Sequence, residues 1–143
     1  MSVKKALVFD IIFILLSVFF ALGSAFVFTA CGAKEDGTFM ICHWAWIAVV
    51  SIAAVLAVQS VLRLFFKSSE AKRGISAAML PLAVLAAIVP KTLINLCMMD
   101  NMHCHTMLRP FALVMGISIA VFSLVDIIAH SAALNKNNLR KPQ

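Results

Sequence analysis

Four long apolar blocks constrain this chain more than any other feature. They cover residues 6–30, 45–66, 75–97 and 107–130, and each reaches about 20 residues, the length that an α-helix needs to cross a bilayer. Hydrophobic residues make up 63% of the 143-residue chain, which is more than a soluble domain carries. The connections are short. We therefore expect a single four-span membrane domain over residues 1–143, folded as an all-α, antiparallel up-down bundle.

Basic residues predict the orientation of that bundle. Lys34 and Arg109 belong to one side, and Lys91 lies within the third block. The other nine of the twelve basic residues belong to the side that carries both chain ends: Lys4, Lys5, Arg63, Lys67, Lys72, Arg73, Lys136, Arg140 and Lys141. The positive-inside rule then places both termini in the cytoplasm. The net charge of +6 follows from this asymmetry, so the expected partner is the lipid bilayer and no nucleic acid is implied.

Three ionisable residues lie within the blocks near that same side. Asp10 is in the first block, Arg63 in the second and Asp126 in the fourth. Ionisable groups at membrane depth usually pair or extend to the surface. We expect an ion-pair set that fixes helix packing rather than a proton path, because no comparable residues continue toward mid-membrane.

Small residues one turn apart occur in the second, third and fourth blocks: Ala53 and Ala57, Ala83 and Ala87, and Gly116 and Ala120. Such pairs let membrane helices approach closely. The connection 68–74 is expected to be a polar cytoplasmic turn, and the tail 131–143 is expected to fray.

Two stretches on the opposite side hold the residues with the richest chemistry. Residues 31–44 and 97–107 contain all four cysteines, three of the four histidines and five of the eight methionines. This side faces the oxidising compartment in the expected orientation, so disulfides are permitted there. Trp44 and Trp46 follow the first stretch, and tryptophans at this depth are typical anchors at lipid headgroups.

The simplest hypothesis for these stretches is a pair of disulfides. Cys31–Cys42 and Cys97–Cys104 would each close a local loop, although four cysteines allow three connectivities and a cross-loop pairing stays open. Each loop closure could contribute about 3 kcal/mol in the chain-entropy model.

A second hypothesis is a soft-metal site, because cysteine and methionine suit copper(I) and imidazole suits copper or zinc. The candidate ligands are Cys42, His43, Met102, His103, Cys104 and His105. The sequence has neither the C-x2-C spacing of a zinc site nor the C-x-x-C-H motif of haem attachment. Cysteine spacing therefore does not identify the cofactor, and copper, zinc and haem all stay open. Lys91 and Arg109 would be supporting charges, although Lys91 could equally extend to the membrane surface.

Two motifs run through these stretches. The first is Cys31-Gly32-Ala33-Lys34-Glu35-Asp36-Gly37 with Met40-Ile41-Cys42-His43-Trp44, and the second is Cys97, Met102-His103-Cys104-His105 and Arg109-Pro110. With these motifs, the chain resembles a family of small bacterial four-helix membrane proteins catalogued as a domain of unknown function. That resemblance implies a four-span fold in the bacterial cytoplasmic membrane and carries no established catalytic residue. It also implies an association with efflux-type transporter permeases, near which members are often encoded.

Two further functions are compatible with these residues. One is a quinone-linked thiol–disulfide oxidoreductase, although such enzymes use a C-x-x-C pair and the spacings here are C-x10-C and C-x6-C. The other is an accessory subunit that docks on a transporter permease or on a second copy of the chain. Phosphate-binding glycine loops and nucleophile motifs are absent from the sequence, so we expect binding rather than catalysis.

Overall fold

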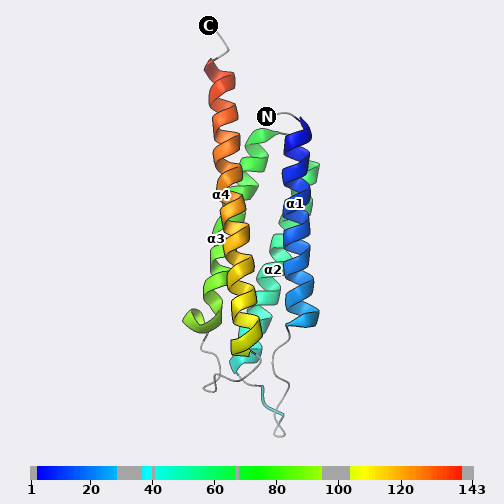
Figure 1. Ribbon diagram of the computed structural model, residues 1–143, viewed down its shortest axis with the longest axis vertical. Helices are drawn as coiled ribbons and strands as arrows, with labels where there is room; N and C mark the ends of the chain where they lie inside the picture. The colour runs from blue at the N-terminus through cyan, green and yellow to red at the C-terminus, as the bar shows by residue number, and fades with distance from the viewer. Residues whose placement is uncertain (1–2, 29–36, 40, 67, 95–103, 140–143) are drawn as a thin grey trace.

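The chain folds into a bundle of long helices (Figure 1). The computed structural model describes residues 3–28, 37–39, 41–66, 68–94 and 104–139, with side chains over a slightly shorter set. The helices are α1 (Val3–Leu22), α2 (Ile41–Phe65), α3 (Ser69–Ile88) and α4 (Arg109–Leu139). Three π-helical turns accompany them: η1 (Gly23–Val27) follows α1, η2 (Val89–Leu93) follows α3 and η3 (Cys104–Leu108) precedes α4.

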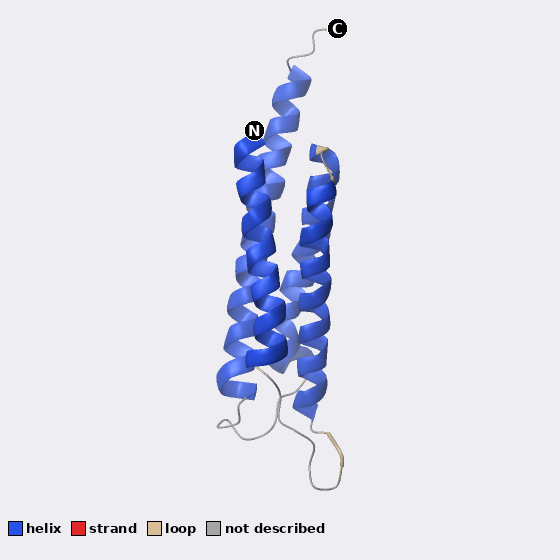
Figure 2. Cartoon of the chain, turned by 90° about the vertical axis from the view of Figure 1, so that its right-hand side faces the viewer, coloured by secondary structure: helices blue, strands red, loops and turns tan. Residues whose placement is uncertain are grey.

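Successive helices run antiparallel, as expected for an up-down bundle (Figures 1 and 2). α1 packs against α2 and α4, and α3 packs against α2 and α4, so α2 and α4 lie on one diagonal of the bundle. The end that carries both chain termini and the α2–α3 turn is called here the terminal end. The opposite end, where α2 and α4 begin, is called the loop end.

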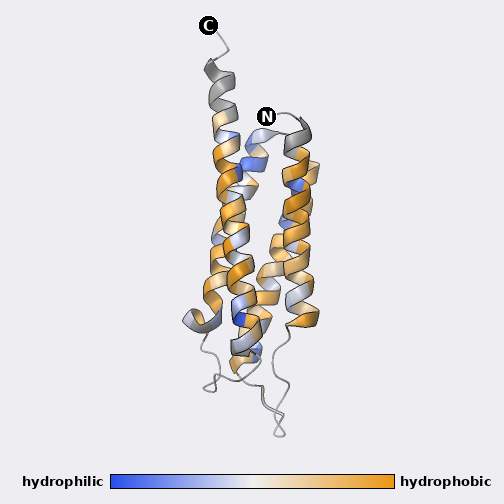
Figure 3. Cartoon of the chain, in the orientation of Figure 1, coloured by the Kyte–Doolittle hydropathy of each residue, from blue (hydrophilic) through white to orange (hydrophobic). Residues whose placement is uncertain are grey.

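Each helix buries one stripe of residues and exposes large apolar side chains elsewhere. In α4, Ala112, Met115 and Ile119 are buried at helical spacing, whereas Val114 and Ile128 are more than half exposed. Figure 3 shows that hydrophobic residues predominate along much of the helices, with hydrophilic residues mainly toward their ends. An exposed apolar surface on every helix suits a lipid environment. Four helices in the described part of the chain are long and apolar enough to span a membrane: Leu7–Val27, Ile41–Phe65, Ser69–Ile88 and Thr106–Ala132.

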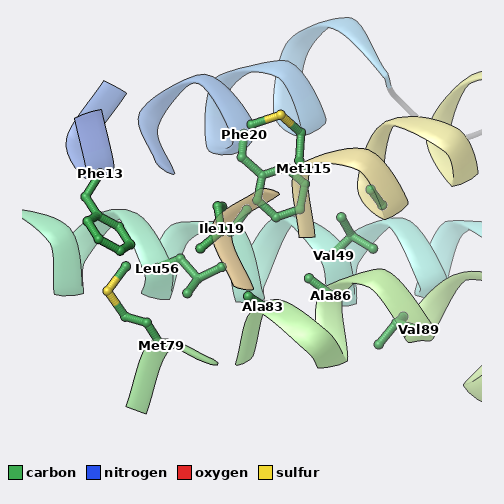
Figure 4. Packing of buried hydrophobic residues seen from close by; sticks show 12 residues of the cluster. Phe13, Phe20, Val49, Leu56, Met79, Ala83, Ala86, Val89, Met115 and Ile119 are labelled. Carbon is green, nitrogen blue, oxygen red and sulfur yellow. The ribbon is translucent and has the colours of Figure 1, made fainter. Parts of the chain in front are cut away.

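The apolar core occupies the middle of the bundle and the part nearer the loop end. Figure 4 shows Phe13 of α1, Leu56 of α2 and Met79 of α3 at one side of this cluster. Phe13 also meets Phe122 of α4 edge-on, with ring centroids 6.3 Å apart. All four helices therefore contribute to one core.

The closest helix approach is at Gly116, between α3 and α4. A Cβ atom placed there would lie 2.7 Å from the Ala83 carbonyl oxygen and 2.9 Å from the Ala87 Cβ atom. The expectation that small residues bring these two helices together is confirmed.

Helix ends differ from the sequence-based expectation at several places. α2 begins at Ile41 rather than at residue 45, and α3 begins at Ser69 rather than at residue 75. α3 ends at Ile88, with η2 continuing to Leu93, rather than at residue 97, and α4 continues to Leu139 beyond the expected end at residue 130.

Hydropathy identifies the part of a helix that lies in lipid, whereas the helix itself can extend beyond that part. At Ser68, the side-chain oxygen accepts a hydrogen bond from the Ala71 amide over 3.2 Å, so an N-cap begins α3. The expected polar turn over residues 68–74 is therefore wrong. The expected fraying is wrong over residues 131–139, and residues 140–143 lie outside the described residues.

Candidate functional site

Arg63 is completely buried at the terminal end and contacts all three other helices. Its Nε atom donates to Asp10 Oδ1 of α1 over 2.7 Å, and one terminal nitrogen donates to Asp126 Oδ1 of α4 over 2.7 Å. The other terminal nitrogen donates to Ser76 Oγ of α3 over 2.6 Å. One guanidinium thus joins four helices, and the expected ion-pair set of Asp10, Arg63 and Asp126 is confirmed.

Lys72 and Ser76 complete this arrangement. Lys72 Nζ donates to the second oxygen of Asp10, and Ser76 Oγ donates to the second oxygen of Asp126 over 2.7 Å. Asp10, Arg63, Lys72, Ser76 and Asp126 are called here the terminal polar cluster. Two carboxylates face two cations, so its formal charges balance and each carboxylate oxygen has a donor.

The ring of Phe13 covers the guanidinium on the core side. The Arg63 Cζ atom lies 4.8 Å from the ring centroid, which is a cation–π contact worth about 2 kcal/mol where water is excluded. Buried ion pairs rarely add much net stability, because desolvation offsets their attraction. Their directed hydrogen bonds instead determine which helix faces meet.

Among the described residues, the charged side chains of the interior end at this cluster, and the polar residues that continue toward the loop end are serines. The next buried residues toward the loop end are Phe13, Ser60, Met79 and Ser123, and those beyond are Ser17, Leu56, Ala83 and Ile119. Ser17 and Ser60 donate to carbonyl oxygens of their own helices, over 2.6 and 2.7 Å. This pattern favours helix fixation over a proton relay.

His130 lies beside the cluster, one turn beyond Asp126 on α4. Its side chain is 4% exposed, and its Nε2 atom is 3.6 Å from Asp126 Oδ1, too far for a hydrogen bond. Neither ring nitrogen has a hydrogen-bond partner among the described residues. The sequence did not lead us to expect Lys72, Ser76 or His130 at this place. Lys72 and Ser76 are four residues apart, as are Asp126 and His130, and this spacing places each pair on one face of a helix.

At the loop end, the structure describes Cys42 and His43 in the first turn of α2. Cys42 is fully buried. The His43 ring stacks on Phe39 with centroids 4.2 Å apart and planes 17° apart, and its centroid is 5.5 Å from that of Trp46. The imidazole is therefore held by aromatic neighbours on two sides.

The two tryptophans of this turn differ in their surroundings. Trp44 is 60% exposed, as expected for an anchor at lipid headgroups. Trp46 instead donates from Nε1 to the Ser24 carbonyl oxygen of η1 over 2.7 Å, which ties α2 to the end of α1.

The remaining predicted site residues are described only in part. Arg109 begins α4, is partly buried and borders a surface depression with Pro110, Leu113 and Val114. The backbones of Cys104 and His105 lie in η3 and that of Lys91 in η2, with side chains outside the described set. Cys31, Cys97, Met102 and His103 lie outside the described residues altogether.

No group of three or more His, Cys, Asp or Glu side chains is placed to hold a metal within the ranges that the structure describes. Of the six candidate metal ligands, those ranges bring together only the sequence neighbours Cys42 and His43. The metal and disulfide hypotheses stay predictions, because most of the side chains that they involve lie outside the described set.

The fold and its apolar surface define a small four-span membrane protein. The model of a domain of unknown function, DUF4418, matches residues 13–129, and the chain belongs to that family. The match agrees with the expected membership in an uncharacterised family, and its range includes Arg63, Ser76, Asp126 and both Cys/His stretches. Searches of the curated proteins and of the solved structures found no match.

Proposed function

We propose that the loop end is a composite site for a soft transition metal, formed by Cys42-His43 from one stretch and Met102-His103-Cys104-His105 from the other. The observation that carries this proposal is the environment of Cys42 and His43. The fully buried side chain of Cys42 is next in sequence to the imidazole of His43, which stacks on Phe39 and lies near Trp46. Soft thiolate and imidazole ligands suit copper(I) or zinc.

The placement of the second stretch is compatible with this site. α2 and α4 both begin at the loop end (Figure 1), and the backbone of Cys104 and His105 forms the turn that leads into α4. Ligands on both stretches would therefore start from the same end of the bundle. The proposal requires neither Lys91 nor Arg109 as a ligand.

The burial of Cys42 favours metal holding over thiol–disulfide exchange. An exchange-active cysteine is usually partly exposed and lies near a positive charge, whereas a buried thiol in apolar surroundings is inert toward exchange. A quinone-linked oxidoreductase would need access to this sulfur. A metal site, by contrast, benefits from a hydrophobic shell that excludes water.

The biological role that fits is sensing, storage or handover of the metal. We propose the bacterial cytoplasmic membrane as the location, with the loop end outside and both termini in the cytoplasm, on the basis of the basic residues at the terminal end. A transporter permease or a second copy of the chain would be the receiving partner, since a holding protein must pass on what it binds.

The test compares the metal content of His43→Ala and His105→Ala variants with that of the unaltered protein, each purified from membranes without chelator. His130→Ala is the matched control, because this histidine lies at the terminal end. We expect both loop-end variants to lose metal and the control to retain it. Equal metal content in all four proteins, or none in any, would refute the proposal. A change in cysteine redox state on adding quinone would favour the oxidoreductase instead.

A further inference from the structure

An apolar groove lies on the outer surface between α3 and α4. Its volume is about 360 Å³, and the residues around it include the small Ala87, Gly116 and Ala120 and the larger, exposed Val84 and Ile117. From Leu113 to Ala120 the groove follows α4 for about 10 Å at 1.5 Å per residue. The described residues that line it are apolar apart from Thr92.

The close approach of the two helices produces this groove. Gly116 lies so near the Ala83 carbonyl that a Cβ atom would be 2.7 Å from it, so the backbones meet where side chains are smallest. Larger side chains stand on either side of that contact. The hollow is therefore part of the rigid helix packing.

A second depression adjoins the groove toward the loop end. Its volume is about 280 Å³, and it is lined by Arg109, Pro110, Leu113 and Val114. Leu113 lines both hollows, so they meet there. No carboxylate in the part of the chain that the structure describes pairs with Arg109.

The position of Arg109 suits a lipid phosphate. It is the fourth residue of the span Thr106–Ala132, about 4.5 Å from its start at 1.5 Å per residue, which is near the depth of headgroups. A guanidinium presents several N–H groups in a fixed fork that matches phosphate oxygens. A cation with no described carboxylate partner, beside an apolar groove, is complementary in charge and shape to an anionic lipid.

We propose that this surface binds one anionic glycerophospholipid, with an acyl chain in the α3–α4 groove and the phosphate on Arg109. The site is separate from the proposed metal site and does not depend on it. A zwitterionic lipid would also fill the groove and also has a phosphate, but its quaternary ammonium cancels the net negative charge that Arg109 attracts.

The first experiment measures retained lipid by native mass spectrometry after reconstitution in equal amounts of phosphatidylglycerol and phosphatidylcholine. We expect the unaltered protein to retain phosphatidylglycerol preferentially. Arg109→Gln should reduce that preference by about tenfold, since a charge-assisted hydrogen bond is lost. Arg73→Gln, an exposed arginine at the terminal end, is the matched control and should leave it unchanged. Equal preference in Arg109→Gln and Arg73→Gln would overturn the phosphate assignment.

The second experiment addresses the acyl chain. Ile117→Trp should fill the groove and reduce retention of both lipids, whereas Val121→Trp, exposed on α4 but not lining the groove, should not.

A photoactivatable phosphatidylglycerol acyl chain should label the unaltered protein at Leu113 or Ile117 and not at Val121, which tests the site without any substitution. Uniform labelling along α4 would overturn the proposal. The proposal would also be overturned if Ile117→Trp converted a dimer to a monomer and left lipid retention unchanged. A second copy of the chain would then be the occupant of the groove.

Discussion

Arg63 and Asp126 meet 2.7 Å apart across the diagonal of the bundle, although their helices α2 and α4 are not neighbours. The same guanidinium reaches Asp10 of α1 and Ser76 of α3. Asp126→Asn would leave Arg63 buried with less than its full countercharge. We expect a loss of about 3–5 kcal/mol in the free energy of unfolding, typical when one partner of a buried ion pair is removed. Reversible unfolding in detergent micelles would measure it.

Arg73→Gln is the control for that substitution, because Arg73 is exposed in the first turn of α3. A second comparison asks whether the cluster mainly determines which helix faces meet or also adds net free energy of unfolding. Replacing Arg63 by Met together with Asp10 and Asp126 by Leu removes most of the buried charge at once, and it should cost less than Asp126→Asn alone. If Asp126→Asn unfolds at the same denaturant concentration as Arg73→Gln, the role assigned to the terminal polar cluster is wrong.

The contact at Gly116 predicts a second stability effect. Gly116→Ala places a methyl group against backbone atoms of α3, so the helices must separate, and we expect a loss of about 1–3 kcal/mol. Gly74→Ala is the matched control, since nothing lies within 4 Å of a Cβ atom there and a helical alanine should stabilise by about 0.5–1 kcal/mol. The unfolding temperatures of both variants, measured in the same lipid, would test this difference in stability. Equal and small effects would contradict the close packing of α3 on α4.

The two tryptophans at the start of α2 predict unequal effects. Trp46→Phe removes the hydrogen bond to the Ser24 carbonyl, and we expect a loss of about 0.5–1.5 kcal/mol. Trp44→Phe retains most of the apolar area of an exposed side chain and should be nearly neutral. Both free energies of unfolding can be measured in micelles. A larger effect at Trp44 than at Trp46 would be inconsistent with the structure.

The proposed orientation predicts where thiols can be labelled. A membrane-impermeant maleimide applied to intact cells after mild reduction should react with cysteines of the loop end, because all four cysteines belong to that side in the expected topology. Labelling of a cysteine introduced at Ser69, in the first turn of α3, should require opened membranes. Labelling of the cysteine at position 69 in intact cells, with the loop-end cysteines protected, would show that the orientation is opposite to the one proposed.

The sequence predicted the four-helix bundle well because hydropathy follows directly from lipid exposure, and each helix exposes apolar residues such as Leu15, Val58 and Val121. It predicted helix starts less well. Residues 69–73 are mostly polar and were expected to form a turn, yet the cap at Ser68 and good helix-forming residues extend the helix beyond the apolar block.

Three members of the terminal polar cluster, Asp10, Arg63 and Asp126, were predictable because charge inside an apolar block needs a partner. Lys72 was missed because its helix was expected to start later. The loop-end site could be predicted only as a set of candidate residues. Ligand geometry there depends on irregular backbone between helices, for which hydrophobic periodicity gives no information.

The proposal that the loop end holds a soft metal through the two Cys/His stretches is tested on two portions of one membrane preparation. The first is purified without reductant or chelator for metal content, and the second has its thiols trapped at lysis for cysteine redox state. We expect copper or zinc in stoichiometric amount in the first portion, and reduced cysteines in the second. A metal-free protein with all four cysteines in disulfides would refute the proposal.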